Sequence, residues 1–412
     1  PETFTKSTPA YFMDKAQRKY IYDIQGGEDG KKLYDAVQKA IDKAKLLADV
    51  VIGLGHLGVD PSSSPWTSEE VIAHTSGFDA FIDGHSHTVM ENKQVQDASG
   101  KAVTLTQTGS YFANVGEMTI AADGTITTKL IPTHEGMDAG IAAMQTGWVN
   151  TVDDMLGEKI AVGDSDFYVS DPATGKRRIR SAETNLGDFV ADGIYTYFNE
   201  IEELHCDVAI MNGGGIRADV PAGDWTFKTC KQVSPFGNVA CLMSVTGKQI
   251  QDALEFAARF AGEDGKENGG FLQVAGATYE IHTDIPNTVQ TDEKNVWIGS
   301  ATGTPRVQNV KIYDKASGSY LPLDPGATYA LAGMNYTLRN LGDGFAMFDG
   351  AELIKDYVSE DYLVMSTYAM IFDGADAAGL PHLSSANSPL AAYPGYLLNY
   401  EQPYGAGRIT IL

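Results

Sequence analysis

The sequence predicts an α/β (α+β) fold divided into more than one domain. Its first part alternates a helix over 30–48, a strand over 50–54, a short helix after Thr67 and a strand over 78–82. This order is typical of an α/β sheet. Thr-, Val- and Ile-rich runs over 102–131 add antiparallel strands. A length of 412 residues is sufficient for two or three domains that each bury a core.

Each element of the first part has a local signal. Residues 1–30 lack periodicity, and we expect them to enter at the edge of a sheet. The apolar runs at 50–54 and 78–82 are followed by Gly55 and Gly84, which is consistent with buried strands. Asp123-Gly124 is a favoured turn of a hairpin. The helix over 30–48 follows from the helical spacing of Leu33, Val37, Ile41 and Ala44.

Two capping boxes mark helix starts. Thr67 is followed at the third position by Glu70, and Thr246 is followed in the same way by Gln249. In this pattern each side chain satisfies the other residue's free backbone N–H. We therefore expect helices to begin directly after Thr67 and Thr246.

The second part also mixes helices and strands. A helical pattern over 135–159 predicts a linker helix packed against its neighbours, and 184–198 predicts an amphipathic helix. Apolar runs over 206–211 and 270–276 predict strands. The last 30 residues are rich in loop-forming residues and predict no further element.

Composition argues against two classes of partner. A net charge of −24 disfavours binding to a nucleic-acid polymer, which requires positive side chains on the phosphates. No apolar run approaches the roughly 20 residues of a membrane-spanning helix. An acidic chain can still bind a small anion through a local arginine cluster or a metal. Cys206, Cys230 and Cys241 are expected to be buried, inert thiols, with one disulfide plus one free thiol as the alternative.

Histidines follow both apolar runs of the first part. His56 follows 50–54 in Gly-His-Leu-Gly, and His85 and His87 follow 78–82 in Gly-His-Ser-His. Ligands bind at the carboxyl ends of strands in α/β sheets, so we expect the three imidazoles to converge there. Imidazole suits Zn, Mn, Fe and Ni, and three protein ligands can form a catalytic metal site. Exposed loop histidines without a ligand are the alternative.

These two segments resemble the second half of a calcineurin-like metallophosphoesterase domain, most closely that of the secreted 5'-nucleotidase family. The resemblance implies a partial metallophosphoesterase β-sandwich flanked by helices over residues 1–132. His56, His85 and His87 would then be about half of a two-metal cage. His87 stands where nucleotidases commonly carry Gln or Asn, and it restores the His-x-His of the wider superfamily.

The family's remaining metal ligands are expected upstream of Pro1. They comprise an Asp-x-His, a bridging Asp and an Asn-His motif. Asn-His does not occur in this chain, and its Asp-x-His, Asp83-Gly84-His85, is part of the Gly-His-Ser-His segment already described. The catalytic histidine of the family is expected upstream as well. We therefore expect this chain alone to bind metal weakly or not at all and to show no turnover.

A basic cluster and a glycine triplet stand out in the second part. Arg180 closes the Lys-Arg-Arg-Ile-Arg run 176–180, and Gly213–Gly215 precedes Arg217. Glycines allow close backbone approach and can present N–H groups to an anion, while paired arginines can clamp a phosphate. A solvated loop and a plain tight turn are the alternatives.

Four motifs of the second part resemble, in order, the 5'-nucleotidase C-terminal domain. They are Asn212–Arg217, Ser234–Asn238, Gly270–Val274 and Asn340–Phe345.

The resemblance implies roles for eight substrate-binding residues. Phe236 and Tyr336 match the two rings that stack on the base, and Asp343 matches the residue that holds the ribose hydroxyls. Arg180 and Arg217 match the arginines that bind the phosphate. The remaining matches to the substrate site are Asn212, Gly214 and Asn238.

The resemblance also implies the organisation and activity of the protein. A linker helix over 133–161 would join the first domain to a 5'-nucleotidase C-terminal α/β domain over 162–412. The expected activity is hydrolysis of a nucleotide to nucleoside and phosphate with two divalent ions, zinc or manganese, in a secreted, periplasmic or cell-surface protein. A 2',3'-cyclic-nucleotide phosphodiesterase, a nucleotide-sugar hydrolase, a non-catalytic nucleoside-binding module and an adhesion or scaffold domain are the alternatives.

Overall fold

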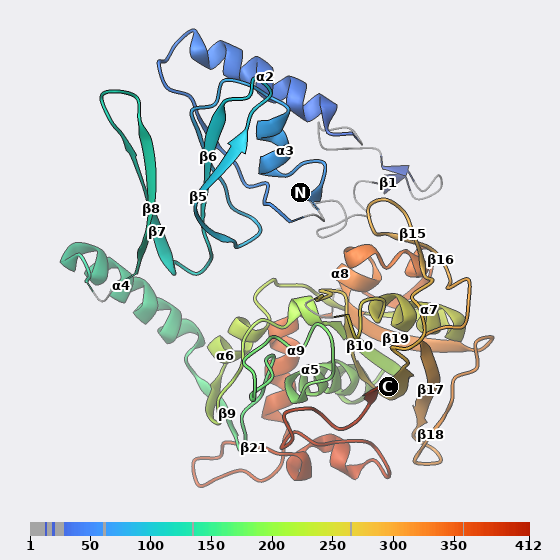
Figure 1. The fold of residues 1–412 in the computed structure, drawn as a ribbon. Coiled ribbons are helices and arrows are strands. Elements are labelled where there is room, and N and C mark those ends of the chain that lie inside the picture. The colour runs from blue at the N-terminus through green and yellow to red at the C-terminus, as the bar shows by residue number, and fades with distance from the viewer. Residues whose placement is uncertain are drawn as a thin grey trace. The chain divides into compact units, whose positions relative to one another are not determined.

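The protein has the mixed α/β fold that the sequence predicts. The computed structural model describes residues 13–14, 19–20, 29–60, 63–133, 136–263, 266–356 and 358–412. Its described part divides into two compact units between Ala142 and Ala143, inside helix α4 (Ala139–Leu156) (Figure 1).

A four-stranded sheet with the order β3-β4-β6-β5 forms the centre of the first unit. Its strands β3 (Ile52–Leu54), β4 (Ala80–Ile82) and β6 (Ala102–Thr108) are parallel. The fourth strand, β5 (Val89–Gln96), pairs antiparallel with β6. The sequence did not predict β5, because its largely exposed, polar residues lack the apolar run that marks a buried strand.

Two helices and a hairpin complete the described part of the first unit. The helices are α2 (Lys31–Lys45) and α3 (Ser68–Ala73), and the hairpin pairs β7 (Asn114–Ile120) with β8 (Ile126–Pro132). The capping box predicted at Thr67 is confirmed, as is the hairpin around Asp123-Gly124. The core of this unit consists of Tyr34, Ile41, Val51, Val71, Ile72, Phe78, Phe81, Val103 and Leu105.

The expectation for residues 1–30 falls mostly outside the described residues. Of this segment, β1 (Met13–Asp14) and β2 (Lys19–Tyr20) are described, and they pair with each other as a two-stranded sheet.

Helix α4 is shorter and more exposed than the sequence predicts. It begins at Ala139 and ends at Leu156, and none of its residues is buried. Large apolar side chains such as Trp148 and Met155 lie exposed on it. The expectation that this helix packs against its neighbours is therefore wrong, since helical periodicity does not reveal whether a partner surface exists.

The second unit is built on a five-stranded sheet with the order β13-β10-β19-β12-β20. Strand β10 lies inside the sheet, parallel to β19 and antiparallel to β13. The strands are β13 (Leu272–Ala275), β10 (Val208–Asn212), β19 (Thr328–Met334), β12 (Ala240–Thr246) and β20 (Glu352–Lys355).

Both faces of this sheet are covered. Alternate residues of β10 belong to two cores: Ala209 and Met211 to one, Val208 and Ile210 to the other. Helix α5 (Asn185–Thr196) packs on β10 and β13 on the first face, and α7 (Gly247–Ala257) contributes to the second core. Because successive side chains of a strand point to opposite faces, a fully buried strand requires a layer on each side.

Smaller sheets and turns surround this centre. One sheet orders β11 (Gly223–Thr226), β9 (Lys159–Gly163) and β21 (His382–Leu383), and another orders β18 (Ser319–Pro322), β17 (Val307–Asp314), β14 (Ala277–Ile281) and β22 (Ile409–Ile411). A third pairs β15 (Gln290–Thr291) with β16 (Trp297–Gly299). The remaining helices and turns are α6 (Phe227–Val233), η3 (Tyr197–Ile201), η4 (Gly213–Gly215), α8 (Asn335–Leu338), η5 (Gly342–Gly344), η6 (Ala346–Phe348), α9 (Asp361–Met370), η7 (Ser385–Asn387) and η8 (Pro389–Ala392).

Helix α5 corrects the prediction of an amphipathic helix over 184–198. All of its residues are buried, including Asn185, Asp188 and Asp192. Its polar residues therefore face protein partners and not solvent. Sequence periodicity cannot distinguish a polar face in water from a polar face inside a buried network.

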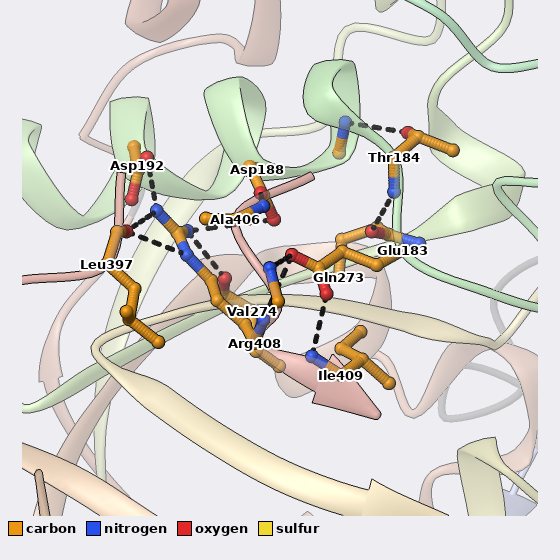
Figure 2. Close-up of polar contacts among 12 residues, drawn as sticks. Glu183, Thr184, Asp188, Asp192, Gln273, Val274, Leu397, Ala406, Arg408 and Ile409 are labelled. Atoms are coloured by element: carbon orange, nitrogen blue, oxygen red, sulfur yellow. Dashed lines mark hydrogen bonds and ion pairs between the residues drawn. The ribbon is translucent and has the colours of Figure 1, made fainter. Parts of the chain in front are cut away.

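A buried arginine organises that network, which Figure 2 shows. The guanidinium of Arg408 is inaccessible to solvent and donates to the carboxylate of Asp192 (2.7 Å) and to the carbonyls of Val274 (2.9 Å) and Leu397 (2.7 Å). Burial alone would lower the pKa of Arg408, but the charges of Asp188 and Asp192 outweigh it and raise this pKa. The charged pair is thus retained inside the protein.

Glu183 fixes the same C-terminal segment. Its carboxylate accepts from the backbone N–H groups of Gly407 (2.9 Å), Arg408 (3.1 Å) and Ile409 (2.7 Å) (Figure 2). The sequence predicted no element in the last 30 residues. In the structure, their backbone hydrogen bonds to Glu183 attach this segment to the rest of the second unit.

The cysteine prediction of buried thiols is confirmed. Cys206, Cys230 and Cys241 are all free and buried. Burial raises the pKa of the Cys230 and Cys241 thiols to about 12, so both remain protonated and unreactive at neutral pH. In the described ranges, no helix has the length and apolar character needed to cross a bilayer.

We expect Asp192→Ala to lower the free energy of unfolding of the second unit by about 3–5 kcal/mol, because it leaves a buried guanidinium without its closest carboxylate. The hydroxyls of Tyr396 and Tyr400 also donate to Asp192 and would lose this acceptor. Urea unfolding measures the change. As a control, Asp224→Ala breaks a half-exposed ion pair with Lys159 and should cost less than about 1 kcal/mol. Equal costs for the two variants would contradict the structural role of the network.

Candidate functional site

The glycine triplet follows β10 and makes contacts inside the protein. The N–H of Gly213 donates to the carbonyl of Phe271 and that of Gly214 to the carbonyl of Gly269, both at 2.7 Å. A Cβ on Gly213 would lie 2.3 Å from the carbonyl oxygen of Ile179. The expectation that these N–H groups face an anion is therefore wrong for Gly213 and Gly214, and the triplet instead permits close backbone packing.

Asp343 lies beside Asn212, although 131 positions separate them in the chain. The side-chain amide of Asn212 donates to the Asp343 carboxylate at 3.3 Å, and both residues are buried. Asp343 adopts a left-handed backbone conformation (φ 54°) between two glycines, which turns the chain sharply at this point.

Tyr336 belongs to the same group. Its pKa is raised, first by burial and then by the charge of Asp343. A Cβ on Gly342 would lie 2.5 Å from the Tyr336 ring, so the glycine leaves room for it. The structure thus brings together Asn212, Tyr336 and Asp343, which the sequence assigns to the base and ribose.

Arg180 is close enough to interact electrostatically with this group. Burial lowers its pKa to about 10, the positive charges of Arg177 and Arg217 also act to lower it, and Glu267 and Asp343 oppose these effects. Its Nε is buried and has no hydrogen-bond partner in the described part of the chain. A buried donor of this kind is a suitable binding group for an anionic ligand.

Arg217, which forms a cationic pair with Arg180, also lies beside the ring of Phe236. Its Nη1 donates to the carbonyl of Gly214 at 3.3 Å, and its guanidinium lies 5.7 Å from the centroid of the Phe236 ring. The Phe236 side chain is 60% exposed, which is unusual for a large apolar ring. An exposed ring beside an arginine is available for stacking.

Asn238 is held by Asp361, a residue that the sequence analysis did not identify. The backbone N–H and side-chain amide of Asn238 donate to one Asp361 carboxylate oxygen at 3.2 and 3.4 Å, and the Asp361 N–H donates to the Asn238 carbonyl at 2.8 Å. Burial raises the pKa of Asp361 to about 6, although Lys231 acts to lower it. The sequence signal that could have identified Asp361 is the Glu-Asp pair at the start of a helix.

In the first unit, His56 and His85 lie together. Their rings are 5.2 Å apart and edge to face, in the loops after β3 and β4. The carboxylate of Asp83 accepts from the N–H groups of Leu57 (2.8 Å) and Gly58 (3.0 Å) and thereby fixes the loop that carries His56. The sequence analysis did not identify Asp83, although it precedes the Gly-His-Ser-His motif directly.

His87 takes a different position. Its ring lies 6.4 Å from that of Tyr111, and His85 and His87 both have left-handed backbone (φ 78° and 56°). The alternation of a strand therefore does not apply to them. Within the described ranges, no three His, Cys, Asp or Glu side chains are arranged to hold one metal ion.

Asp361 generates a testable pH dependence. Its folded pKa lies above the value of about 3.9 in an unfolded chain, so the folded state binds more protons between about pH 4 and 6. Its contribution to stability is full below pH 4 and is lost as the pH rises through about 6.

Relative to Asp361→Asn, we expect the wild type to lose about 2–3 kcal/mol of unfolding free energy between pH 4 and pH 7. Urea unfolding at a series of pH values measures this difference. A constant difference between the two proteins across that range would show that Asp361 titrates normally.

Comparison with known proteins places these residues in a family. Residues 161–350 match the family model described as "5'-nucleotidase, C-terminal domain". The chain is 30% identical over 328 residues to the trifunctional nucleotide phosphoesterase protein YfkN of Bacillus subtilis (strain 168), covering 77% of this chain and 20% of that protein. It is 26% identical to the 5'-nucleotidase of Homo sapiens, covering 81% and 58%, and to the apyrase of Tabanus yao, covering 82% and 62%.

The fold agrees with these matches. The solved 5'-nucleotidase precursor of Thermus thermophilus superimposes with a TM-score of 0.62 at 23% identity, over 92% of this chain and 67% of that one. This chain spans less than two thirds of the length of the curated relatives named above. From the family-model match and the sequence relatives together, residues 161–350 carry a 5'-nucleotidase C-terminal domain, and the chain is similar to members of the 5'-nucleotidase family.

Proposed function

We propose that the protein is a hydrolase of the 5'-nucleotidase type, which converts a nucleotide to a nucleoside and phosphate with divalent metal ions. The observation that carries this proposal is the grouping of Arg180, Arg217 and Asp343 inside the segment that matches the family model. A cationic pair next to a buried carboxylate suits a ligand that has a phosphate at one end and hydroxyls at the other.

Each residue of the group has a distinct role in this proposal. Arg180 and Arg217 donate to the phosphate and offset its charge. The carboxylate of Asp343 accepts hydrogen bonds from the ribose hydroxyls, and Asn212 orients that carboxylate. The rings of Phe236 and Tyr336 stack on the base, with Gly214 and Asn238 as further contacts.

The metal ligands in this proposal are His56, His85 and His87. The fit is partial: the rings of His56 and His85 lie together at one sheet edge, as two nitrogen ligands of a transition metal would, whereas His87 lies beside Tyr111. Two divalent ions, zinc or manganese, would supply polarisation of the phosphate and activation of water when bound. The part of this chain is to hold the imidazoles in place, through Asp83 and the loop after β3.

The same proposal covers organisation and location. Residues 1–132 are assigned to the metallophosphoesterase part, 133–161 to a linker and 162–412 to the substrate-binding domain. The division of the chain into two compact units inside α4 supports this assignment. A secreted, periplasmic or cell-surface location is proposed from the family resemblance.

Phe236→Ala tests the nucleoside site. Loss of a stacking ring should weaken adenosine binding by about 1–3 kcal/mol, or roughly 5- to 150-fold, measured by titration calorimetry without metal. Phe112→Ala is the matched control, because Phe112 is an exposed ring outside the candidate site, and it should leave the affinity unchanged. Equal affinity of the Phe236→Ala variant and the wild type would contradict the stacking role.

His56→Ala tests the metal site. Binding of Mn²⁺ or Zn²⁺, measured by titration calorimetry, should weaken about tenfold or more, because an imidazole ligand is lost. His74→Ala is the control, since His74 stacks on Tyr34 (4.4 Å) away from the two paired histidines. Equal metal affinity of the His56→Ala variant and the wild type would contradict the role of His56 as a ligand.

A further inference from the structure

We infer that Gln273 is a positioning residue for Arg180: its side-chain amide holds the backbone turn from which the arginine reaches the phosphate site. This inference rests on the proposed function, since it assigns a task to a residue that serves the phosphate-binding arginine. Gln273 stands inside one of the four motifs, but its position in the sequence assigns it no role of its own.

The amide of Gln273 spans the turn on both sides of Arg180. Its Nε2 donates to the carbonyl of Ile179 at 3.0 Å and to the carbonyl of Ala182 at 2.9 Å. Its Oε1 accepts from the N–H of Thr184 at 3.4 Å. Gln273 is inaccessible to solvent. Both amide protons and the oxygen are therefore committed to the segment 179–184, whose geometry they determine.

Two further contacts fix the same peptide. The N–H of Asn268 donates to the carbonyl of Arg180 at 3.1 Å, while the Asn268 side chain is anchored by donating to the carbonyl of Ala257 at 2.7 Å. Gly213 packs so closely on Ile179 that a Cβ would come within 2.3 Å of its carbonyl oxygen. The Arg180 backbone is thus held from β13, from the loop before it and from the glycine triplet.

The guanidinium of Arg180 needs such support, because burial and two neighbouring arginines disfavour its charge, and Glu267 and Asp343 offset them only in part. It lies near two other arginines, and its Nε has no partner among the described residues. Without a ligand, few interactions stabilise a positive side chain in this position. The side chain would move toward solvent if its turn were mobile. A rigid backbone keeps the charge in place until an anion arrives.

The neighbourhood of Gln273 shows that the amide, and not merely its volume, is required. Gln273 is a polar residue in a buried strand between Leu272 and Val274, where an apolar side chain would fill the space at lower desolvation cost. Gly187, in the first turn of α5, leaves room for the amide, since a Cβ there would lie 2.3 Å from Oε1.

Titration calorimetry of a double-mutant cycle with AMP and adenosine, without metal, tests the inference. The proteins are the wild type, Arg180→Ala, Gln273→Met and the double variant. Methionine keeps the length of the side chain and removes both donors. We expect Gln273→Met to weaken AMP binding about tenfold and to change adenosine binding less than about twofold, because only AMP carries the phosphate. The double variant should bind AMP no more weakly than Arg180→Ala.

Three outcomes decide the matter. Additive losses in the cycle, or equal weakening of AMP and adenosine, would overturn the positioning role and indicate a general packing role. A wild type that binds AMP no better than adenosine would contradict the proposed phosphate site, and the inference with it. If Gln273→Met does not fold, Gly187→Ala replaces it in the cycle, since the added methyl displaces the amide from the other side, and the same selective loss of AMP binding is expected.

Discussion

The second unit depends on a guanidinium that is buried without access to water. Arg408 cannot lose its proton, so each N–H that folding removes from solvent must find an acceptor inside the protein. Its acceptors come from α5, from β13 and from the backbone at Leu397. These segments are far apart in the chain, and the charge holds them in one arrangement. Hydrophobic burial alone would stabilise the layers without specifying their register so strictly.

The hydrogen-bond network around Arg408 is connected to the candidate substrate site through adjacent residues. Val274 accepts from Arg408, while its neighbour Gln273 donates to the turn that carries Arg180. Glu183 binds the C-terminal backbone and stands one residue before Thr184, the cap of α5. The buried network and the binding group therefore share a strand and a helix start. The interactions that stabilise the second unit therefore also help to fix the position of the proposed phosphate-binding arginine.

The first unit uses a carboxylate for a comparable purpose. Asp83 accepts two backbone N–H groups from the loop after β3 and also the side-chain amide of Gln107 at 3.1 Å. The loop that carries His56 is thereby tied to the segment that carries His85. In both units, a buried polar side chain fixes the backbone next to a residue that is proposed to bind a ligand. The buried side chain itself has no proposed ligand contact.

Local signals in the sequence were enough to predict several helices and strands. Both capping boxes, the two strands that precede the Gly-His motifs and the hairpin at Asp123-Gly124 follow from signals among near neighbours. The motifs were sufficient to gather Asn212 and Asp343 into one expected site, and the structure brings these two together.

The contacts that support those residues could not be predicted before the fold was known. The burial of α5 on all sides, the use of the Gly213 and Gly214 N–H groups within the protein and the tie through Arg408 depend on contacts between distant segments. Left-handed backbone at His85 and His87, with the His87 ring beside Tyr111, likewise departs from the expected convergence of three imidazoles. A pattern of residue types records which side chains are polar or apolar. It does not record their partners, because burial and hydrogen bonding are set where separate parts of the chain meet.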